Sequence, residues 1–352
     1  MKTVSVNTPS KTYPVEIGQG LLEQAGRKIC QLHCKNVMVV TDSHVAPLYG
    51  QKVLDCLKSA GLEVSQFVFP AGEGSKCAQT LLALLNEMAA CHFTRSDAVV
   101  ALGGGVVGDL AGLAASLYMR GMKLVQLPTT LLSAVDSSVG GKTAIDLPAG
   151  KNLVGTFYQP DLVLCDIDTL TSLPAAEIAN GQAEVIKYAF LKDASILELL
   201  HAHENLEDMI ARCVAIKRDV VCADERESGL RQLLNFGHTF AHSIEQNSGY
   251  TIPHGSAVAV GMVLITRAAV KKGLCDASRL KTLLQVLDEC HLPVSTEYSP
   301  DALFATVLSD KKRAADSITL VVPRKIGLCE LQKVSLEDAR TFLQLGMTGE
   351  SV

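Results

Sequence analysis

Residues 99–110 read Val-Val-Ala-Leu-Gly-Gly-Gly-Val-Val-Gly-Asp-Leu, and residues 128–146 read Pro-Thr-Thr-Leu-Leu-Ser-Ala-Val-Asp-Ser-Ser-Val-Gly-Gly-Lys-Thr-Ala-Ile-Asp. In the first stretch, an apolar run enters a glycine cluster and continues with helix-like spacing. A buried parallel strand that leads through glycine into a helix N-terminus commonly holds a phosphate-bearing ligand. The stretch therefore predicts a nucleotide-binding α/β domain, and a tight turn without a ligand is the alternative.

Strand-like and helix-like segments alternate around this motif. Strands are expected at 36–41, 64–69, 97–102, 123–128 and 162–166, with helices after the first three over roughly 45–60, up to 90 and up to 118. This alternation favours a mostly parallel sheet with helices on both faces. The N-terminal segment lacks the apolar core of a signal peptide and is expected to form an edge strand.

From Leu173 onward the apolar residues recur at helical spacing. Helices are expected at 175–191, 196–201, 206–226, 232–246, 256–272 and 277–290, and a short strand pair near 317–323 and 327–332 is expected to cover a sheet edge. The chain is thus predicted to contain an α/β nucleotide-binding domain over 1–172 and a mainly helical, all-α domain over 173–352 that binds metal and substrate.

Composition narrows the class of protein. The chain has 352 residues, a formal net charge of -5, 48% hydrophobic residues and eleven scattered cysteines. It shows no basic footprint for nucleic acid and no apolar stretch long enough for a bilayer. Scattered cysteines in a long chain indicate reduced thiols, and these predict that the protein is located in the cytoplasm. Any anionic substrate must be bound by locally placed cations.

Polar residues near the glycine-rich turns are candidate ligand contacts. Asp42 ends an early strand, where a carboxylate can bind a ribose hydroxyl, although capping the next helix is the simpler role. Lys142 and Lys151 lie in glycine-flanked segments and could neutralise a phosphate; solvated loop lysines are the alternative.

The histidines suggest a metal. His238 and His242 are four residues apart on a predicted helix, so they share a face and could bind one zinc ion. His254 lies in a Pro-His-Gly turn, and Glu184 could add a carboxylate ligand. Hydrogen-bonded structural histidines remain an equal alternative at this point.

Four motifs together resemble the 3-dehydroquinate synthase family. They are Gly-Gly-Gly-Val-Val-Gly-Asp at 103–109, the block at 128–146, Gly-Lys-Asn-Leu-Val-Gly at 150–155 and Asn-Phe-Gly-His-Thr-Phe-Ala-His at 235–242. The resemblance extends from about 42 to 327. It implies conversion of 3-deoxy-D-arabino-heptulosonate 7-phosphate to 3-dehydroquinate and phosphate, a step of the shikimate pathway towards aromatic amino acids. The implied course is transient oxidation by NAD, phosphate elimination, re-reduction and intramolecular aldol closure, with Zn²⁺ or Co²⁺ as the metal.

The resemblance also implies a role for individual residues. The metal ligands would be Glu184, His238 and His254, whereas His242 would contact the substrate phosphate. NAD would contact Asp42, Gly72, Glu73, Ser75, Lys76, Gly105, Val106, Val107, Gly108, Asp109, Thr129, Thr130, Lys142, Lys151, Thr169, Leu170, Thr171 and Ser172. The substrate would contact Asp136, Lys142, Asn152, Lys187, Lys217, Arg231, Asn235 and His242. Arg120 is similar to a family arginine that reaches the neighbouring subunit's phosphate site, which implies a homodimer.

Two departures and three rival functions accompany this resemblance. Ala241 replaces the family's usual glycine between His238 and His242, a change that a helix should tolerate. The family's His-Gly-Glu is His254-Gly255-Ser256 here, so a carboxylate near the third metal ligand is missing. The rivals are another sugar-phosphate cyclase, a metal-dependent polyol or alcohol dehydrogenase, and a non-catalytic relative. Lys217, Arg231 and Asn235 favour the dehydroquinate enzyme because they suit a substrate carboxylate.

Overall fold

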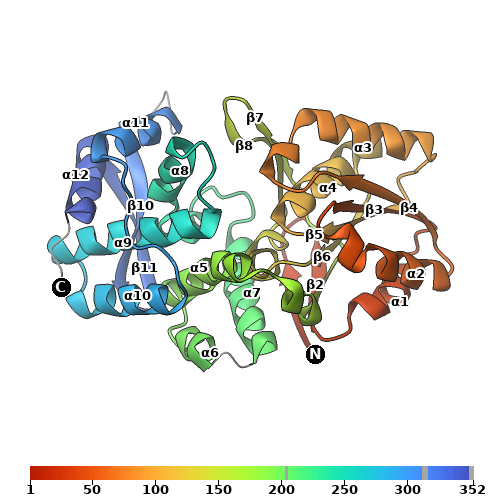
Figure 1. Ribbon diagram of the computed structural model, residues 1–352, viewed down its shortest axis with the longest axis horizontal. Helices are drawn as coiled ribbons and strands as arrows, with labels where there is room; N and C mark the ends of the chain where they lie inside the picture. Colours follow the sequence, from red (N-terminus) through yellow and green to blue (C-terminus); the bar gives the residue numbers. More distant parts are fainter. Residues whose placement is uncertain (203–204, 311–315, 349–352) are drawn as a thin grey trace. The chain divides into compact units, whose positions relative to one another are not determined.

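The computed structural model describes residues 1–202, 205–310 and 316–348 (Figure 1). The chain divides into two compact units. The first unit contains 1–174 and 206–225, and the second contains 175–205 and 226–352. Within the described residues, no helix is both long and apolar enough to cross a membrane.

The first unit is built on a seven-stranded sheet. Its strands lie in the order β1-β2-β9-β6-β5-β3-β4. The bounds are β1 Lys2–Asn7, β2 Thr12–Gly18, β3 Asn36–Asp42, β4 Glu63–Phe69, β5 Ala98–Gly103, β6 Lys123–Pro128 and β9 Leu162–Asp166. β1 pairs antiparallel with β2, and the remaining neighbours pair in parallel. The expected parallel sheet and its N-terminal edge strand are both confirmed.

Helices cover both faces of this sheet because the central strands are apolar on both sides. In β3, Met38 and Val40 pack towards α3 (Ala78–Ala90) and α4 (Gly105–Leu117). Val37 and Val39 pack on the opposite face, towards α1 (Ala25–Cys30) and α2 (Gln51–Ser59). Figure 1 shows these two helix pairs on opposite sides of the sheet. Short helical turns complete the unit: η1 Leu22–Gln24, η2 Ala46–Gly50, η3 Glu73–Ser75, η4 Tyr118–Arg120, η5 Ser133–Ser137 and η6 Ile167–Ser172.

A hairpin replaces the glycine-flanked loops expected around Lys142 and Lys151. Its strands are β7 (Lys142–Leu147) and β8 (Gly150–Phe157), which pair antiparallel. Gly155 of β8 packs directly against the Thr143 carbonyl, where a Cβ would collide. The abundant glycine thus serves strand packing as well as turns.

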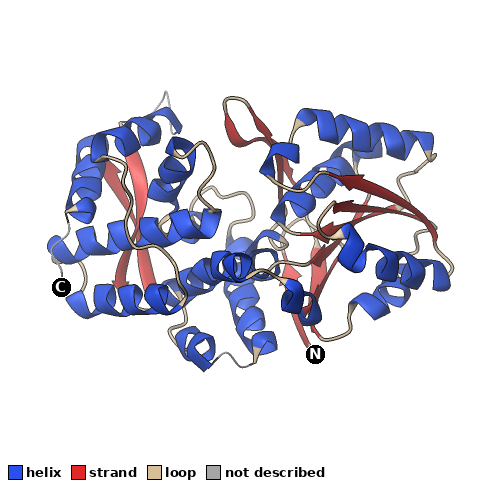
Figure 2. Ribbon diagram, in the orientation of Figure 1, coloured by secondary structure: helices blue, strands red, loops and turns tan. Residues whose placement is uncertain are grey.

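The second unit is mainly helical, as expected (Figure 2). Its helices are α5 Ala175–Leu191, α6 Ile196–Ala202, α8 His238–Asn247, α9 His254–Lys271, α10 Ala277–Glu289, α11 Pro300–Asp310 and α12 Leu336–Met347, with the turn η7 Leu230–Asn235. The strands β10 (Ser317–Lys325) and β11 (Leu328–Ser335) pair only with each other in the described structure. The predicted strand pair therefore exists, but its expected role of covering an edge of the large sheet is wrong.

The helix expected at 232–246 is interrupted. Gly237 has a φ of +81°, and η7 ends before it while α8 starts after it. A Cβ at Gly237 would lie 2.7 Å from Met262 Cγ, so this position needs glycine both for its conformation and for close packing. Apolar periodicity continues across the break, which is why the pattern alone predicts one helix.

One segment lies in a different unit from the one that the predicted boundary gives it. Helix α7 (Leu206–Ala223) follows α6 in sequence but belongs to the first unit. It contacts β1 and β2, and its buried residues include Met209, Ile210, Val214 and Val221. The apolar stripe of α7 is buried there, so spatial packing rather than chain order decides its unit.

Candidate active site

Three side chains from three helices of the second unit converge on one point. They are Glu184 of α5, His238 of α8 and His254 of α9, and their potential ligand atoms all lie within 4.8 Å of one another. Glu184 is wholly buried, and its Oε1 lies 3.5 Å from His238 Nε2 and 3.4 Å from His254 Nε2. A buried carboxylate beside two imidazole nitrogens is a donor set suited to a divalent transition metal.

Close helix packing brings His254 to this point. Gly255, the next residue, lies so near the Asn180 carbonyl that a Cβ there would collide with it. The Gly255 N–H also donates to the Asn180 side chain. Asn180 is one helical turn before Glu184 on α5, so this contact places the start of α9 beside the carboxylate.

The protonation of His238 suits metal binding. Burial, reinforced by the charge of Lys187, lowers the pKa of His238 well below its ordinary value, so the ring is neutral. Its Nδ1 lies 3.1 Å from the Phe236 carbonyl oxygen, to which an Nδ1–H donates. This hydrogen bond selects the tautomer that leaves the Nε2 lone pair directed towards Glu184.

His254 lies in a field that favours positive charge. Burial by itself would lower the pKa of His254, but hydrogen bonds to Glu184 and Glu245 outweigh it and raise the pKa to about 10. Carboxylates that favour a proton at this ring also favour a divalent cation in its place. The residues present therefore fit a metal such as zinc or cobalt.

Other residues with expected roles surround this cluster. Lys187 lies one turn from Glu184 on α5 and forms an ion pair with it. The His242 ring lies edge-on to His238, with 5.7 Å between centroids, and is not part of the three-residue cluster. The simple pairing of His238 with His242 on one metal is therefore not the arrangement seen. Arg231 is buried in η7, and Asn235 donates to Glu227 at 2.9 Å.

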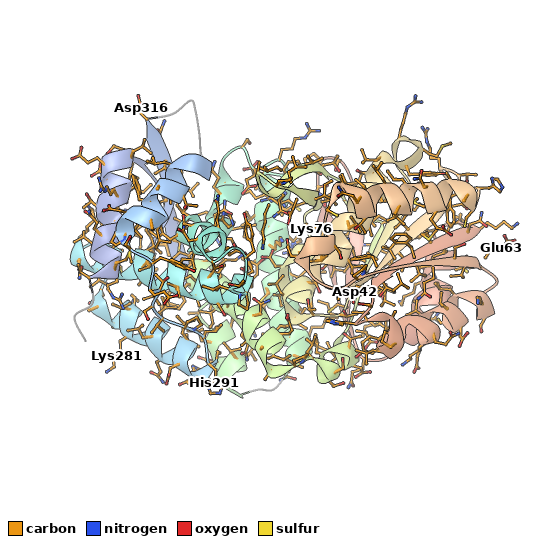
Figure 3. The ribbon with its side chains drawn as sticks, turned by 45° about the horizontal axis from the view of Figure 1, so that its top comes forward. Asp42, Glu63, Lys76, Lys281, His291 and Asp316 are labelled. Carbon is orange, nitrogen blue, oxygen red and sulfur yellow. The ribbon has the colours of Figure 1, made fainter. Side chains whose placement is uncertain are left out.

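One edge of the first unit is a candidate nucleotide-binding edge. β3 leads to β4 on one side and β5 leads to β6 on the other, so the strand order reverses between β3 and β5. Ligands in parallel α/β sheets bind outside the carboxyl ends of the strands at such a reversal. Asp42 ends β3, and Gly103–Gly105 connect β5 to α4. Figure 3 shows Asp42 and Lys76 at this end of the sheet and Glu63 at the other.

The start of α4 suits a phosphate. Its N-cap is Gly104, which has no side chain to occupy the first N–H groups. The expected pyrophosphate contacts at Gly105 to Asp109 form the first turns of this helix. Exposed backbone N–H groups at a helix start attract anions.

Lys76 connects several of the expected cofactor contacts. Its Nζ lies 2.7 Å from Asp109 Oδ2 and donates to Asn152 Oδ1 at 2.6 Å. Burial by itself would lower the pKa of Lys76, but the charges of Asp109 and Glu73 outweigh it and raise the pKa. Lys151 lies 3.8 Å from Glu73, so this charged network joins the β7–β8 hairpin to the loop after β4.

Asp42 forms a turn at the end of β3, and the predicted capping role is wrong, because the N-cap of η2 is Val45 and no side chain caps that helix. Its Oδ1 accepts hydrogen bonds from the backbone N–H groups of His44 and Val45, at 2.8 and 2.9 Å. Because a carboxylate has two oxygens, these hydrogen bonds to Oδ1 leave Oδ2 as a separate acceptor.

The remaining expected contacts are spread over the first unit. Thr129 and Thr130 follow β6, Thr169 to Ser172 form part of η6, and Lys142 begins β7. Tyr49 Oη lies 2.6 Å from Ser172 Oγ and 3.0 Å from the Thr169 carbonyl oxygen, which fixes η6 beside η2. Lys217 of α7 forms an ion pair with Asp136 of η5.

Arg120 lies far from the nucleotide-binding edge of its own unit. It follows α4, whose other end carries the glycine cluster, and a helix of that length spans about 20 Å. Met119 and Arg120 both have positive φ angles, and Arg95 donates twice to the Met119 carbonyl. The Arg120 side chain is exposed, on a turn with strained backbone angles that the hydrogen bonds from Arg95 hold in place.

Sequence reasoning missed one acidic residue at the cluster. Glu245 of α8 is buried, and its Oε1 lies 3.5 Å from His254 Nδ1. Glu245 is seven residues after His238, so both lie on the same helix face, and this spacing was the available signal.

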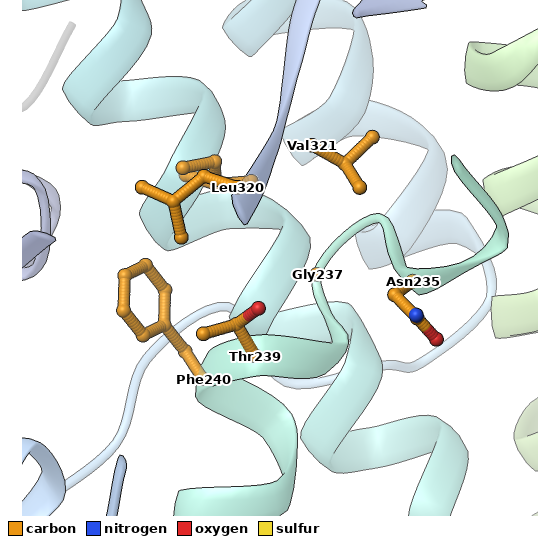
Figure 4. A pocket seen from close by; sticks show the side chains of 7 residues that line it. Asn235, Gly237, Thr239, Phe240, Leu320 and Val321 are labelled. Carbon is orange, nitrogen blue, oxygen red and sulfur yellow. The ribbon is translucent and has the colours of Figure 1, made fainter. Parts of the chain in front are cut away.

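A small pocket in the second unit is separate from this cluster (Figure 4). Its lining is mostly apolar and consists of Asn235, Gly237, Thr239, Phe240, Ile265, Leu320 and Val321. It contains none of the three clustered ligand residues, so we place the chemistry at the cluster rather than in this pocket.

The fold and the two sites define a class: an enzyme with a nucleotide-binding α/β unit and a metal-binding helical unit. Family models described as the N-terminal and C-terminal parts of 3-dehydroquinate synthase match residues 66–180 and 181–313. A 3-dehydroquinate synthase of Lactiplantibacillus plantarum is 43% identical over 352 residues, covering 97% of this chain and 98% of its own. The chain belongs to the 3-dehydroquinate synthase family.

Solved structures agree with this assignment. A 2-deoxy-scyllo-inosose synthase bound to carbaglucose-6-phosphate, NAD⁺ and Co²⁺ is 26% identical, with a TM-score of 0.88 over 97% of this chain and 99% of that one. A 2-epi-5-epi-valiolone synthase from Streptomyces hygroscopicus with NAD⁺ and Zn²⁺ is 30% identical, with a TM-score of 0.86 over 98% and 99%. Both proteins bind NAD⁺ and a divalent metal within the same fold.

Proposed function

We propose that the protein converts 3-deoxy-D-arabino-heptulosonate 7-phosphate to 3-dehydroquinate and phosphate, with NAD and Zn²⁺ or Co²⁺. The observation that carries this proposal is the buried Glu184–His238–His254 cluster in a chain of this family. When bound, NAD supplies reversible hydride transfer and the metal supplies Lewis-acid polarisation of substrate oxygens.

Glu184, His238 and His254 would bind the metal. Three protein ligands leave coordination positions open for substrate hydroxyls, as a catalytic site requires. The Phe236 carbonyl would maintain the required tautomer of His238, and Lys187 would balance the charge of Glu184. The catalytic contribution of these residues is orientation and charge placement.

The proposed NAD contacts follow the edge between β3 and β5. The first turns of α4 would bind the pyrophosphate through backbone N–H groups, and Asp42 would use its second carboxylate oxygen for a ribose hydroxyl. Lys76 and Lys151 would supply positive charge next to the cofactor.

Cationic and amide side chains would bind the anionic substrate. Lys142, Asn152 and His242 are proposed for its phosphate, and Lys187, Lys217, Arg231 and Asn235 for its carboxylate and hydroxyl groups, with Asp136 orienting Lys217. Burial of Lys187, Lys217 and Arg231 strengthens their interaction with an anion, because the surrounding dielectric is low.

We further propose that the active protein is a homodimer in which Arg120 serves the neighbouring chain. The position of Arg120, at the end of α4 away from the glycine cluster, supports this proposal. The exposed side chains of Leu117 and Met119 beside it provide apolar area that a second copy could cover.

The deciding experiment measures phosphate release from 3-deoxy-D-arabino-heptulosonate 7-phosphate by metal-stripped protein, with NAD and either zinc or cobalt added back. Equimolar phosphate and dehydroquinate, without net NADH and lost again on chelation, are expected. Glucose 6-phosphate and a simple alcohol serve as control substrates. Turnover of glucose 6-phosphate alone, or NADH accumulation with the alcohol, would replace the proposal with one of its rivals.

A further inference from the structure

Glu245 is a buried acid to which none of the roles above has been given. Its side chain is 4% exposed, and its Oε1 faces Nδ1 of His254 at 3.5 Å. A carboxylate is costly to bury unless a charged or hydrogen-bonding group accompanies it. The His254 ring supplies such a group.

The two ring nitrogens of His254 face two different carboxylates. Nε2 lies 3.4 Å from Glu184, whereas Nδ1 lies 3.5 Å from Glu245. His238 differs, because its Nδ1 faces the neutral carbonyl of Phe236. A carboxylate on the far nitrogen fixes the tautomer and also raises the basicity of the nitrogen that binds a metal.

We propose that Glu245 is a positioning residue for the metal centre. It accepts a hydrogen bond from Nδ1–H of His254, directs Nε2 towards the metal and increases metal affinity. This inference rests on the proposed metal ligation by His254. This chain has Ser256 where the family has a glutamate, and Glu245 of α8 would instead provide a carboxylate beside His254.

The test compares Glu245→Gln and Glu245→Leu with the unchanged protein and with Ser243→Ala. Ser243 is a matched control because it is a buried polar residue on α8 whose Oγ lies 3.5 Å from the Thr239 carbonyl. Zinc affinity is measured by competition with a chromogenic chelator. Visible absorption of the Co²⁺-loaded proteins reports ligand geometry, and thermal unfolding of the metal-free proteins reports structural damage.

Glu245→Leu is expected to weaken zinc binding by about 10- to 100-fold and to shift the Co²⁺ absorption bands. Glu245→Gln retains an oxygen acceptor but loses the charge, so its zinc affinity should fall between those of the unchanged protein and Glu245→Leu. Ser243→Ala should match the unchanged protein in both metal measurements.

Two results would overturn the inference, and they are distinguishable. If the unchanged protein binds zinc and both Glu245 variants bind zinc as tightly as it does, the role of Glu245 is wrong and the metal site stands. If the unchanged protein binds neither zinc nor cobalt, the proposed metal ligation fails together with it. If Glu245→Leu does not fold, the zinc affinities of Glu245→Gln and Ser243→Ala decide. The inference requires weaker zinc binding by Glu245→Gln than by Ser243→Ala.

Discussion

An imidazole ring has only two nitrogens, and in His254 each already faces a carboxylate. A third carboxylate introduced at position 256 could not hydrogen-bond to this ring. We therefore predict that Ser256→Glu changes zinc affinity by no more than about twofold, because Glu245 already provides the proposed hydrogen bond to Nδ1 of His254. Chelator competition checks this prediction, and a tenfold gain in affinity would show that Glu245 does not fulfil the role assigned to it.

Loss of His238, a proposed metal ligand, should abolish activity while leaving the fold intact. His238→Ala removes one of the three proposed metal donors, and turnover is expected to fall by at least about 100-fold. The metal-free variant should retain the far-ultraviolet circular dichroism of the unchanged protein, since the hydrogen bond of the ring to the Phe236 carbonyl is local to the start of α8. Phosphate release and bound zinc are measured together; full activity without bound zinc would contradict the metal assignment.

The sequence partly predicted the grouping of these ligands. The four-residue spacing of His238 and His242 is a local signal, and it favours His242, which is not a member of the three-residue cluster. His254 joins the cluster because Gly255 allows α9 to approach Asn180 closely. A contact between distant segments has no periodicity to reveal it. The residues alone offered Glu184 and His254 only as candidates, and the resemblance to a known family selected them.

At the scale of an element, Asp97 joins the start of β5 to β3 and to the preceding turn. Its carboxylate accepts hydrogen bonds from the Asn36 backbone and side chain, and from the Thr94 backbone and hydroxyl. Burial by itself would raise the pKa of Asp97, but these four hydrogen bonds outweigh it and lower the pKa. The ionised carboxylate therefore stabilises the folded state.

We predict that Asp97→Asn lowers the free energy of unfolding by about 2 kcal/mol at neutral pH. In the unfolded chain this group titrates near its ordinary value of about 4, whereas in the folded protein it titrates lower. Its stabilising contribution is present above that ordinary value and is lost as the pH falls through the folded-state pKa. Urea unfolding of both proteins at pH 7 and below pH 4 should show the difference narrowing; a constant difference would contradict this account.

Elements with regular patterns were predicted well. The strands at 123–128 and 162–166 and the helix at 175–191 have the predicted bounds, because apolar periodicity and flanking turns define them. The β7–β8 hairpin was not predicted, since its glycines resemble loop residues. The break at Gly237 was also missed, because a left-handed backbone conformation leaves no trace in an apolar pattern.

For the whole molecule, the proposed dimer predicts complementation between two inactive variants. Arg120→Ala and Lys142→Ala should each lose most activity. When the two chains are unfolded and refolded together, half of the dimers are mixed, and one of the two sites in each mixed dimer has both residues intact. About a quarter of the unchanged activity is then expected.

Activity measured before and after joint refolding checks this prediction, with each variant refolded alone as the control. A homodimer with Arg120 in its own site would recover nothing, and a monomer by sedimentation would contradict the dimer itself.

The position of α7 has a consequence for how the protein is made. Residues 175–205 belong to the second unit, yet they leave the ribosome before residues 206–225, which complete the first. Until then, the apolar residues of β1 and β2, such as Val4 and Ile17, lack the helix that packs on them. A gene cut after codon 174 should therefore yield an aggregation-prone polypeptide, whereas residues 1–174 fused through a short glycine–serine linker to 206–225 should remain monodisperse in light scattering. The border between the two units therefore does not coincide with a single point along the nucleotide sequence.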